Sequence, residues 1–398
     1  MLRLGTCRIP LRSPRRYYST KTKTLKVAVE GCCHGKLDDI YKQVASMERK
    51  GKYKIDLLLI CGDFQATRNA QDLECMAVPP KHKHLNDFPK YYTGQKRAPI
   101  LTVFIGGNHE ASNYLTELHY GGWVAPNQYY LGRSGCIQVN GVRIAGASGI
   151  YTEAQYEKGY FEKLPYTLHA LKSIYRIRQY DIYKLALLTK PHIFLSHDWP
   201  KGITEHGDQG ALLRDKPAFK SEIADGTFGA PPLMDLLKAL RPEWWFAAHM
   251  HVLFKATVKH DDSVTKFTAL DKCLPGRKCL EVIDIPAIAG TTKLTFDPEW
   301  LAITRALQPF FNQVQSRALL PPQHLSGQLV KRHLEWVLEH VGQDRPVGSV
   351  QKFQPTAPGP TGRDNRTQPS AYFNQQTEAF CDMLQIPDLI NPRTSFWS

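Results

Sequence analysis

The chain of 398 residues lacks any apolar run of the roughly 18 residues that a membrane-crossing helix needs, and this excludes a membrane-embedded protein. Its nine cysteines include no C-x-x-C pair and show no regular spacing, and no secretory apolar segment precedes them. These absences exclude a secreted disulfide framework and indicate a reducing compartment. With 42% hydrophobic residues the chain can bury one large core and an appendage, so we expect two domains.

Residues 1–24 contain no acidic residue and seven basic ones, so they carry half of the net charge of +14 and leave the body of the chain at +7. An arginine-rich, acid-free leader that ends near Arg16-Tyr17-Tyr18-Ser19 is similar to a mitochondrial transit peptide. A disordered tail or a wrongly assigned start is the alternative. The basic body suits a polyanionic substrate such as nucleic acid, because binding it releases counterions.

Polar residues with metal-binding side chains follow several short apolar runs at the points where strands should end. They are Cys32, His34, Asp63, Asn108, His109, His197, His249 and His251. Short runs rich in β-branched and aromatic residues, ended by glycine, predict buried strands of an α/β sheet. Such folds place their sites at the carboxyl ends of strands.

The donor types indicate the metal chemistry. Imidazole, carboxylate, amide oxygen and one thiolate suit zinc, iron or manganese, whereas an all-oxygen set would indicate magnesium or calcium. Asp63 is the carboxylate available to bridge two ions, and a bridged pair can activate water and clamp the oxygens of an in-line displacement at phosphorus. The pattern therefore predicts a phosphoesterase with two divalent metals.

The blocks occur in the order C-x-H, G-D, G-N-H-E, H and H-x-H, and this order resembles the calcineurin-like metallophosphoesterase superfamily. Cys32 replaces the usual aspartate, and Ala248 replaces the usual glycine before His249. Both departures resemble the RNA lariat debranching enzymes. Three further stretches, at 120–127, 196–200 and 296–301, are also similar to that family, and the resemblance runs from about residue 25 to residue 387.

The resemblance implies a four-layer αββα sandwich with a small helical C-terminal domain. It implies hydrolysis of the 2′,5′-phosphodiester at the branch point of excised intron lariat RNA, in the nucleus, with spliceosome-associated factors as possible partners. The mitochondrion is the alternative location because of the leader. Alternative functions are a 3′,5′ nuclease or protein phosphatase on the same site, or a scaffold without catalysis.

The resemblance also implies roles for the site residues. One metal would be held by Cys32, His34, Asp63 and His251, and the other by Asp63, Asn108, His197 and His249. His109 would protonate the leaving 2′-oxygen or stabilise the phosphoryl oxygens. An inert core cysteine at Cys32 and a turn histidine at His109 are the alternatives. A thiolate ligand favours zinc or iron over magnesium and makes the site sensitive to oxidation.

The segment 148–178 interleaves tyrosines with lysines and arginines, which suits stacking on unpaired bases and contact with phosphates. An insertion that packs its rings internally is the alternative. The resemblance implies that this segment is the lariat recognition loop, and we expect Tyr151, Tyr156, Tyr175 and Arg176 to bind substrate.

The expected organisation is a basic leader at 1–24, a catalytic domain at 25–290, a helical C-terminal domain at 291–341, a linker or disordered segment at 342–369, and a docking segment at 370–398. Expected strands are 25–30, 55–61, 100–105, 191–196 and 244–248, with a hairpin at 137–146 around Asn140-Gly141. Strands at 252–258, 264–270 and 280–285 would form a second sheet packed on the first. Expected helices begin after Gly35 and lie at 180–188, 233–240 and 374–384, with two more in the C-terminal domain.

Overall fold

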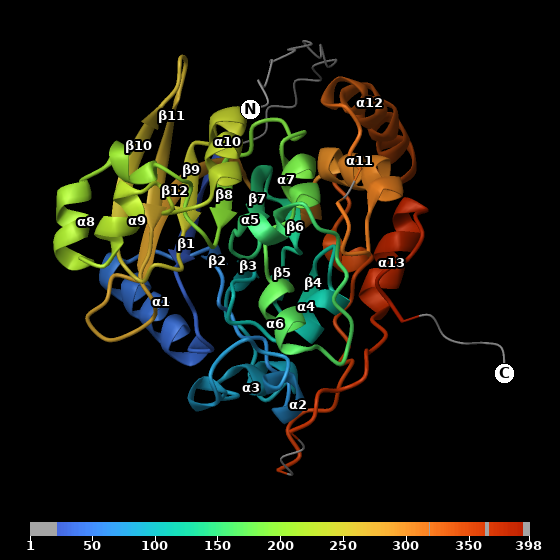
Figure 1. Ribbon diagram of the computed structural model, residues 1–398, viewed down its shortest axis with the longest axis horizontal. Helices are drawn as coiled ribbons and strands as arrows, with labels where there is room; N and C mark the ends of the chain where they lie inside the picture. Colours follow the sequence, from blue (N-terminus) through green and yellow to red (C-terminus); the bar gives the residue numbers. More distant parts are fainter. Residues whose placement is uncertain (1–21, 318, 363–365, 393–398) are drawn as a thin grey trace.

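The computed structural model describes residues 22–317, 319–362 and 366–392, so the basic leader lies almost wholly outside the described residues. Two β-sheets pack against each other and helices cover their outer faces (Figure 1). This is the four-layer α/β sandwich that the resemblance implied. Within the described part of the chain, no helix combines the length and the apolar character that crossing a membrane requires.

The first sheet has the order β12-β1-β2-β3-β5-β4. Its strands are β1 (Thr22–Glu30), β2 (Leu57–Ile60), β3 (Leu101–Phe104), β4 (Gly122–Ala125), β5 (Gln128–Tyr130) and β12 (Leu280–Ile288). Strands β1, β2, β3 and β5 run parallel, so their carboxyl ends lie at one edge of the sheet.

The second sheet has the order β10-β11-β9-β8-β7-β6-β13. Its strands are β6 (Ser134–Val139), β7 (Val142–Ala147), β8 (Ile193–Ser196), β9 (Trp244–Ala247), β10 (Phe254–Lys259), β11 (Val264–Ala269) and β13 (Leu294–Phe296). The hairpin predicted around Asn140-Gly141 is confirmed, since β6 and β7 pair on either side of it. Strands β7, β8, β9 and β11 are parallel.

Two strand assignments from the sequence were wrong. The strand predicted at 280–285 for the second sheet is β12, and it pairs antiparallel with β1 in the first sheet. The runs that deliver His197 and His249, expected beside β1–β3, are β8 and β9 of the second sheet. A short apolar run carries no information on which neighbour it will pair with, because every strand offers the same backbone groups.

The strands of the first sheet alternate their side chains between two cores. Leu25, Val27 and Val29 of β1 face the second sheet, whereas Ala28 packs in a separate cluster that includes Leu37 and Ile40 of the first helix. That helix, α1 (Leu37–Gly51), follows β1 as predicted. Helices α7 (Gln179–Leu185) and α10 (Pro231–Leu240) cover the second sheet.

The sequence analysis did not predict the shorter helices, because none of them reaches two full turns. They are α2 (Ala70–Leu73), α3 (Phe88–Tyr92), α4 (Ser112–Glu117), α5 (Glu153–Tyr156), α6 (Leu168–Ser173), α8 (Gln209–Asp215) and α9 (Phe219–Ala224). A segment of four to seven residues shows too little periodicity to be distinguished from a loop.

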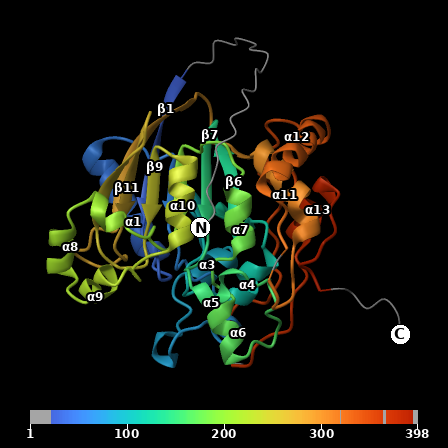
Figure 2. The same cartoon turned by 45° about the horizontal axis from the view of Figure 1, so that its top comes forward.

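The three C-terminal helices α11 (Pro298–Leu307), α12 (Gln323–His340) and α13 (Gln375–Leu384) lie together on one side of the sandwich (Figures 1 and 2). Arg305 of α11 donates to the carbonyl of Leu384 in α13 at 2.9 Å, which joins the first and last of them. The predicted helix at 374–384 is confirmed.

The segment predicted as a linker or as disorder, 342–369, is packed on the body of the protein over its described residues. The Gln351 amide donates to Gly121 O at 2.8 Å, and Tyr92 Oη donates to Ala357 O at 2.8 Å. Thr356 donates to Glu117 at 2.7 Å. The prediction of disorder was wrong there because a proline-rich stretch can be held by side chains from the domain that it crosses, which its own composition does not reveal.

Candidate metal centre

The polar residues predicted as ligands meet where the parallel strands of both sheets end. Cys32 and His34 follow β1, Asp63 follows β2, and Asn108 follows β3, all in the first sheet. The other ligands come from the second sheet, where His197 follows β8 directly and His249 and His251 follow β9. The candidate centre therefore lies between the two sheets, and each sheet supplies part of it.

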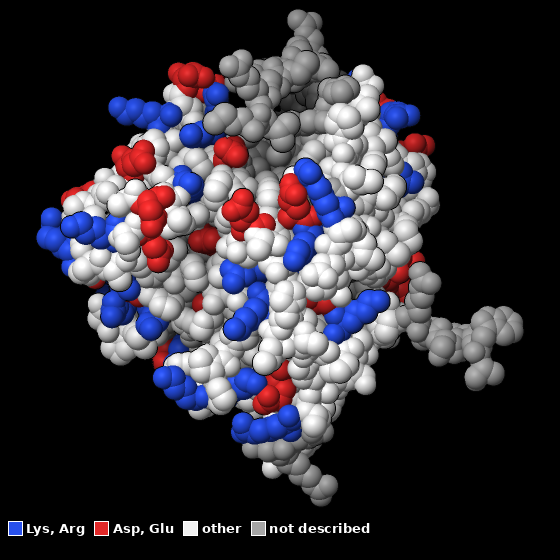
Figure 3. Space-filling model, in the orientation of Figure 1, with Lys and Arg blue, Asp and Glu red and all other residues white. Residues whose placement is uncertain are grey.

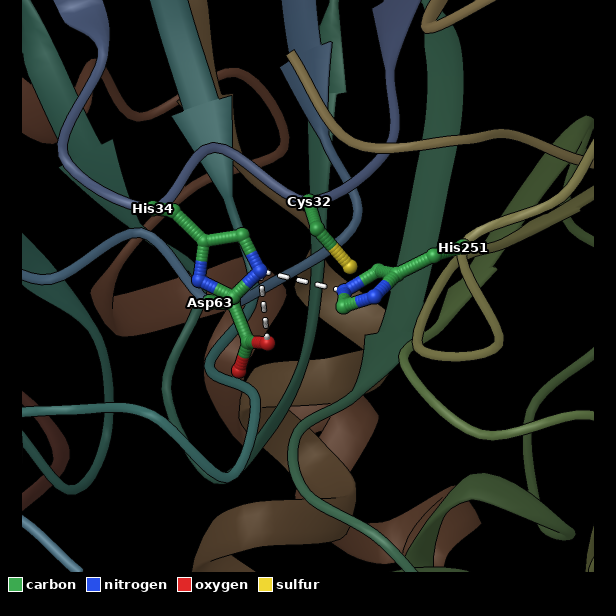
Figure 4. A group of neighbouring side chains, drawn as sticks. All are labelled: Cys32, His34, Asp63 and His251. Atoms are coloured by element: carbon green, nitrogen blue, oxygen red, sulfur yellow. Dashed lines mark hydrogen bonds and ion pairs between the residues drawn. The ribbon is translucent and has the colours of Figure 1, made fainter. Parts of the chain in front are cut away.

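Cys32, His34, Asp63 and His251 point toward one another (Figure 4). One potential ligand atom from each of the four lies within 4.8 Å of all the others. His34 Nε2 lies 3.1 Å from His251 Nε2 and 3.6 Å from Asp63 Oδ2. A thiol, two imidazoles and a carboxylate at these separations can surround a single ion.

A second group forms around the other oxygen of Asp63. His197 Nε2 lies 3.3 Å from Asp63 Oδ1 and 3.2 Å from Asn108 Oδ1. The rings of His197 and His249 have centroids 5.1 Å apart. Asp63 thus faces His34 with one oxygen and His197 with the other, which places it between the two groups.

The backbone at the centre is unusually strained. His34, Asp63, His249 and His251 all have positive φ angles between 46° and 64°. The left-handed region costs a non-glycine residue on the order of 1 kcal/mol. Such conformations persist where the surrounding structure enforces them and are concentrated at functional sites.

Two glycines allow the ligand loops to approach each other closely. A Cβ at Gly107 would lie 2.2 Å from Asp63 Oδ1 and 2.7 Å from His197 Nε2. Gly62 has a φ of 108°, and a Cβ there would lie 2.4 Å from His197 Nδ1. These contacts explain why glycine precedes both Asp63 and Asn108.

Supporting residues that the sequence analysis gave no role hold the loops in place. The buried Glu110 carboxylate accepts from the backbone N–H groups of Phe64, Gln65 and Gly107 at 2.8–2.9 Å, which ties the Asp63 loop to the Asn108 loop. The Gln65 amide lies 3.4 Å from His34 Nδ1. Glu110 stands in the G-N-H-E block and could have been found there, but no sequence signal marks Gln65.

The electrostatics favour cation binding. Burial lowers the pKa of His34 to about 4 and that of His251 to about 3, so both imidazoles are neutral and have lone pairs available at pH 7. Burial acts to raise the pKa of Asp63, but the facing imidazoles, His197 first, outweigh it and lower the pKa well below its usual value. Burial raises the pKa of Cys32, so its thiolate requires a cation alongside it.

These residues fit divalent metal ions. The neutral imidazoles of His34 and His251 and the ionised Asp63 carboxylate are ready to ligate, and the buried Cys32 thiol, which accepts from His249 N–H at 3.2 Å, is within reach of the same point. Cys33 and Cys61 are also fully buried, but the metal-binding group found among the described residues includes neither.

His109 lies at the edge of the centre. Its backbone N–H donates to Asp63 Oδ1 at 2.8 Å, and its half-buried ring meets the His34 ring edge-on at 5.2 Å. The side chain is therefore beside the ligands without being part of either group.

The predicted recognition loop, 148–178, is hydrogen-bonded to the ligand loops. Tyr151 N donates to Asp198 Oδ2 at 2.9 Å, directly after His197, and Gly149 N donates to Gly106 O at 2.8 Å. The proposed substrate residues Tyr151, Tyr156, Tyr175 and Arg176 are all half-buried. The Tyr151 and Tyr156 rings meet at 5.5 Å, and the Arg176 guanidinium lies 5.0 Å from the Tyr175 ring.

Sequence comparisons give the family. Residues 25–253 match the model of the calcineurin-like phosphoesterases, and residues 262–389 match that of the lariat debranching enzyme C-terminal domain. The chain is 45% identical over 372 residues to the lariat debranching enzyme of Arabidopsis thaliana, with 92% of this chain and 88% of the relative covered. The chain belongs to the lariat debranching enzyme family.

Vertebrate lariat debranching enzymes are similarly close. The human enzyme is 44% identical over 380 residues, covering 92% of this chain and 70% of the relative, and the Danio rerio enzyme is 44% identical over 385 residues, covering 92% and 66%. Membership of the lariat debranching enzyme family, with its phosphoesterase domain, confirms the predicted resemblance and enzyme class: the chain is a metal-dependent phosphodiesterase.

Proposed function

We propose that this enzyme hydrolyses the 2′,5′-phosphodiester at the branch point of excised intron lariat RNA and releases linear RNA for turnover. The observation that supports this most is the attachment of segment 148–178 to the metal centre through the Tyr151–Asp198 and Gly149–Gly106 hydrogen bonds. Aromatic and cationic side chains thereby reach the edge of a phosphoesterase site. Its relatives are named lariat debranching enzymes, which supports a branched RNA as the substrate.

We propose two divalent ions, one held by Cys32, His34, Asp63 and His251 and the other by Asp63, Asn108, His197 and His249. When bound, such ions lower the pKa of water and neutralise charge on phosphoryl oxygens. Cys32 favours zinc or iron at the first position, with manganese also compatible with the nitrogen and oxygen donors.

We propose that His109 acts as the general acid that protonates the leaving 2′-oxygen. Its backbone N–H is held by the Asp63 carboxylate. Its half-buried ring lies next to His34 and belongs to neither proposed group of metal ligands. A ring in this position can approach a phosphodiester that contacts both ligand groups.

Substrate selection is proposed to rest on stacking and local charge. On the face shown in Figure 3, basic side chains are interspersed with acidic ones and do not form one continuous block. This face therefore offers no continuous basic surface for RNA, and we propose that specific contacts from Tyr151, Tyr156, Tyr175 and Arg176 to splayed-out nucleotides select the substrate.

We propose a nuclear location, where introns are excised, and contact with spliceosome-associated factors. The mitochondrion is the second candidate because of the acid-free leader. Imaging fluorescent fusions with and without residues 1–24 tests this, since a targeting leader would redirect the full-length fusion alone.

The decisive experiment compares cleavage of a branched RNA with that of a linear RNA of equal length and sequence by the metal-loaded protein. Release of the branch at the 2′,5′ bond with an intact linear control is expected. Equal cleavage of both would indicate a 3′,5′ nuclease, activity on a phosphoprotein alone would indicate a phosphatase, and no activity with metals bound would indicate a scaffold.

A further inference from the structure

A cavity of about 820 Å³ lies outside the metal centre. Its walls come from helix α4, from the recognition loop between Tyr160 and Tyr166, and from the C-terminal segments 368–372 and 388–392. This volume is within the range of specific ligand sites. Neither group of metal ligands contributes to its lining.

The lining has basic groups without acidic partners. Arg133 is buried, and its guanidinium donates only to the backbone carbonyls of Ile174 and Arg176, with Nε unpaired. Lys163 is exposed, and within the described residues it forms no ion pair. The Arg133 guanidinium also lies 5.4 Å from the centre of the Tyr160 ring, but it has no ion pair with a described residue, and a buried cation of this kind is stabilised further by an anion close by.

The acids in the lining are already engaged. Glu117 pairs with Arg68 at 2.8 Å, and Glu162 pairs with the buried Arg178. Asp388 accepts from the backbone N–H groups of Ile390 and Asn391 at 2.9 and 3.0 Å. Each acid of the lining thus has an ion pair or backbone N–H donors, whereas Arg133 and Lys163 have no acidic partner among the described residues. The cavity therefore suits an anion.

The remaining walls are aromatic or have unused hydrogen-bonding capacity. Tyr160, Tyr166, Phe311 and Tyr372 line the cavity. Two lining residues that are 97% buried, Asn113 and His119, each have a side-chain atom without a hydrogen-bond partner, Asn113 Oδ1 and His119 Nε2. A ligand with an anionic part and a flat, polar ring would match this combination.

The cavity adjoins the ligand loops. A gap of about 10 Å³ is lined by Gly106 and Gly107 of the Asn108 loop, and it shares Thr116 and Arg133 with the large cavity. The gap is about the size of one water molecule, and the shared residues place the large cavity next to the loop that carries Asn108. The polymer that the enzyme is proposed to hold there is RNA, each unit of which has a phosphate and a base.

We infer that this cavity is a nucleotide subsite that holds one nucleotide of an RNA arm some distance from the scissile bond. The phosphate lies toward Lys163 and Arg133, and the base lies among the tyrosine rings. The inference rests on the proposed function and adds to it the place where an arm of the branched substrate is bound.

The test measures kcat and KM on branched RNAs whose arms are shortened one nucleotide at a time. Lys163→Glu reverses the exposed charge at the cavity, and Ser370→Trp fills part of it. Lys220→Glu is the control, because Lys220 is exposed and lies outside both the recognition loop and the cavity lining. Both cavity variants are expected to raise KM about tenfold for long arms and to have no effect on arms too short to reach the cavity.

The outcomes separate the two proposals. If wild-type protein does not cleave branched RNA at all, the proposed function fails, and crosslinking of 4-thiouridine RNA to the peptide containing Tyr166 or Tyr372 then tests the subsite alone. If branched RNA is cleaved but Lys163→Glu behaves like Lys220→Glu at every arm length, the subsite is overturned. Competition by adenosine monophosphate that Lys163→Glu abolishes, without any arm-length effect, would assign the cavity to a free nucleotide and overturn the RNA assignment.

Discussion

His197 Nδ1 lies 2.7 Å from the carbonyl oxygen of Cys61, which accepts a hydrogen bond from it. Cys61 directly follows β2 of the first sheet and His197 directly follows β8 of the second, so this bond joins the two sheets at the metal centre. It also fixes the imidazole tautomer, because a proton on Nδ1 leaves Nε2 with a lone pair toward Asp63 and Asn108. The position of one ligand thus depends on how the sheets pack.

Asp63→Asn is expected to reduce metal content and abolish hydrolysis while the fold persists. The carboxylate faces both ligand groups, and an amide removes the negative charge that both ions would share. Metal analysis, circular dichroism and branched-RNA cleavage measure the three effects. Asp56→Asn, on the far end of β2, is the control, and full activity with two metals bound would refute the assignment.

Cys32→Ser is expected to weaken one metal much more than the other, because only the first group contains sulfur. Titration of zinc and iron into metal-stripped protein measures this. The variant should also lose less activity on peroxide treatment than wild type. Cys75→Ser, a buried cysteine outside the site, controls for stability; unchanged stoichiometry together with unchanged oxidant sensitivity would argue against ligation.

Gly107→Ala is expected to lower activity about 100-fold, since the new methyl group would displace the Asp63 carboxylate or His197. The neighbouring Gly106→Ala is a strict control, because its Cβ would lie 3.2 Å from the flexible end of Leu115. Kinetics on a small aryl phosphodiester report the effect without RNA binding. Equal rates for the two variants would show that the loops tolerate the methyl group.

Replacing Tyr151, Tyr156 and Tyr175 together by alanine is expected to depress branched-RNA cleavage by one to several orders of magnitude, as stacking contributes about 1–3 kcal/mol per base. Hydrolysis of the aryl phosphodiester should be nearly unchanged because it needs only the metals. Tyr53→Ala, remote from the loop, is the matched control. A parallel loss of both activities would mean that the tyrosines support the fold instead.

His119→Phe is expected to flatten the acid dependence of stability. Burial lowers the pKa of His119 to about 3, so between pH 3 and 6.5 the unfolded chain binds a proton that the folded protein excludes. Wild-type stability therefore falls as the pH drops below 6.5, by up to about 1.4 kcal/mol per pH unit from this group. Phenylalanine keeps the edge-on packing against Tyr160 and Phe311 without titrating.

Urea unfolding at pH 6.5, 5.5 and 4.5 measures the difference. The free energy of unfolding of His119→Phe relative to wild type should rise toward low pH. The exposed His206→Phe is the control and should show no such trend. If the two variants share the wild-type slope, His119 titrates normally in the folded protein.

Much of the centre follows from the sequence, because strand ends and ligand types are local properties. Cys32, His34, Asp63, Asn108 and His197 each stand just beyond a short apolar run, and parallel strands end at a common edge. The order of the blocks was specific enough to point to the family that the comparisons then showed. Helix α1 and the β6–β7 hairpin were likewise predictable from periodicity and from one turn dipeptide.

Only the tertiary structure decided which ligands share a site and what holds them. His34 and His251 are 217 positions apart and meet at 3.1 Å because their strands lie in different, facing sheets. The sheet to which β12 belongs, the Glu110 bonds between two ligand loops, and the cavity beside the recognition loop also arise from long-range packing. A strand can form backbone hydrogen bonds and bury apolar surface with many alternative partners. Which segments pair is therefore decided by the free energy of the whole fold and not by any single segment.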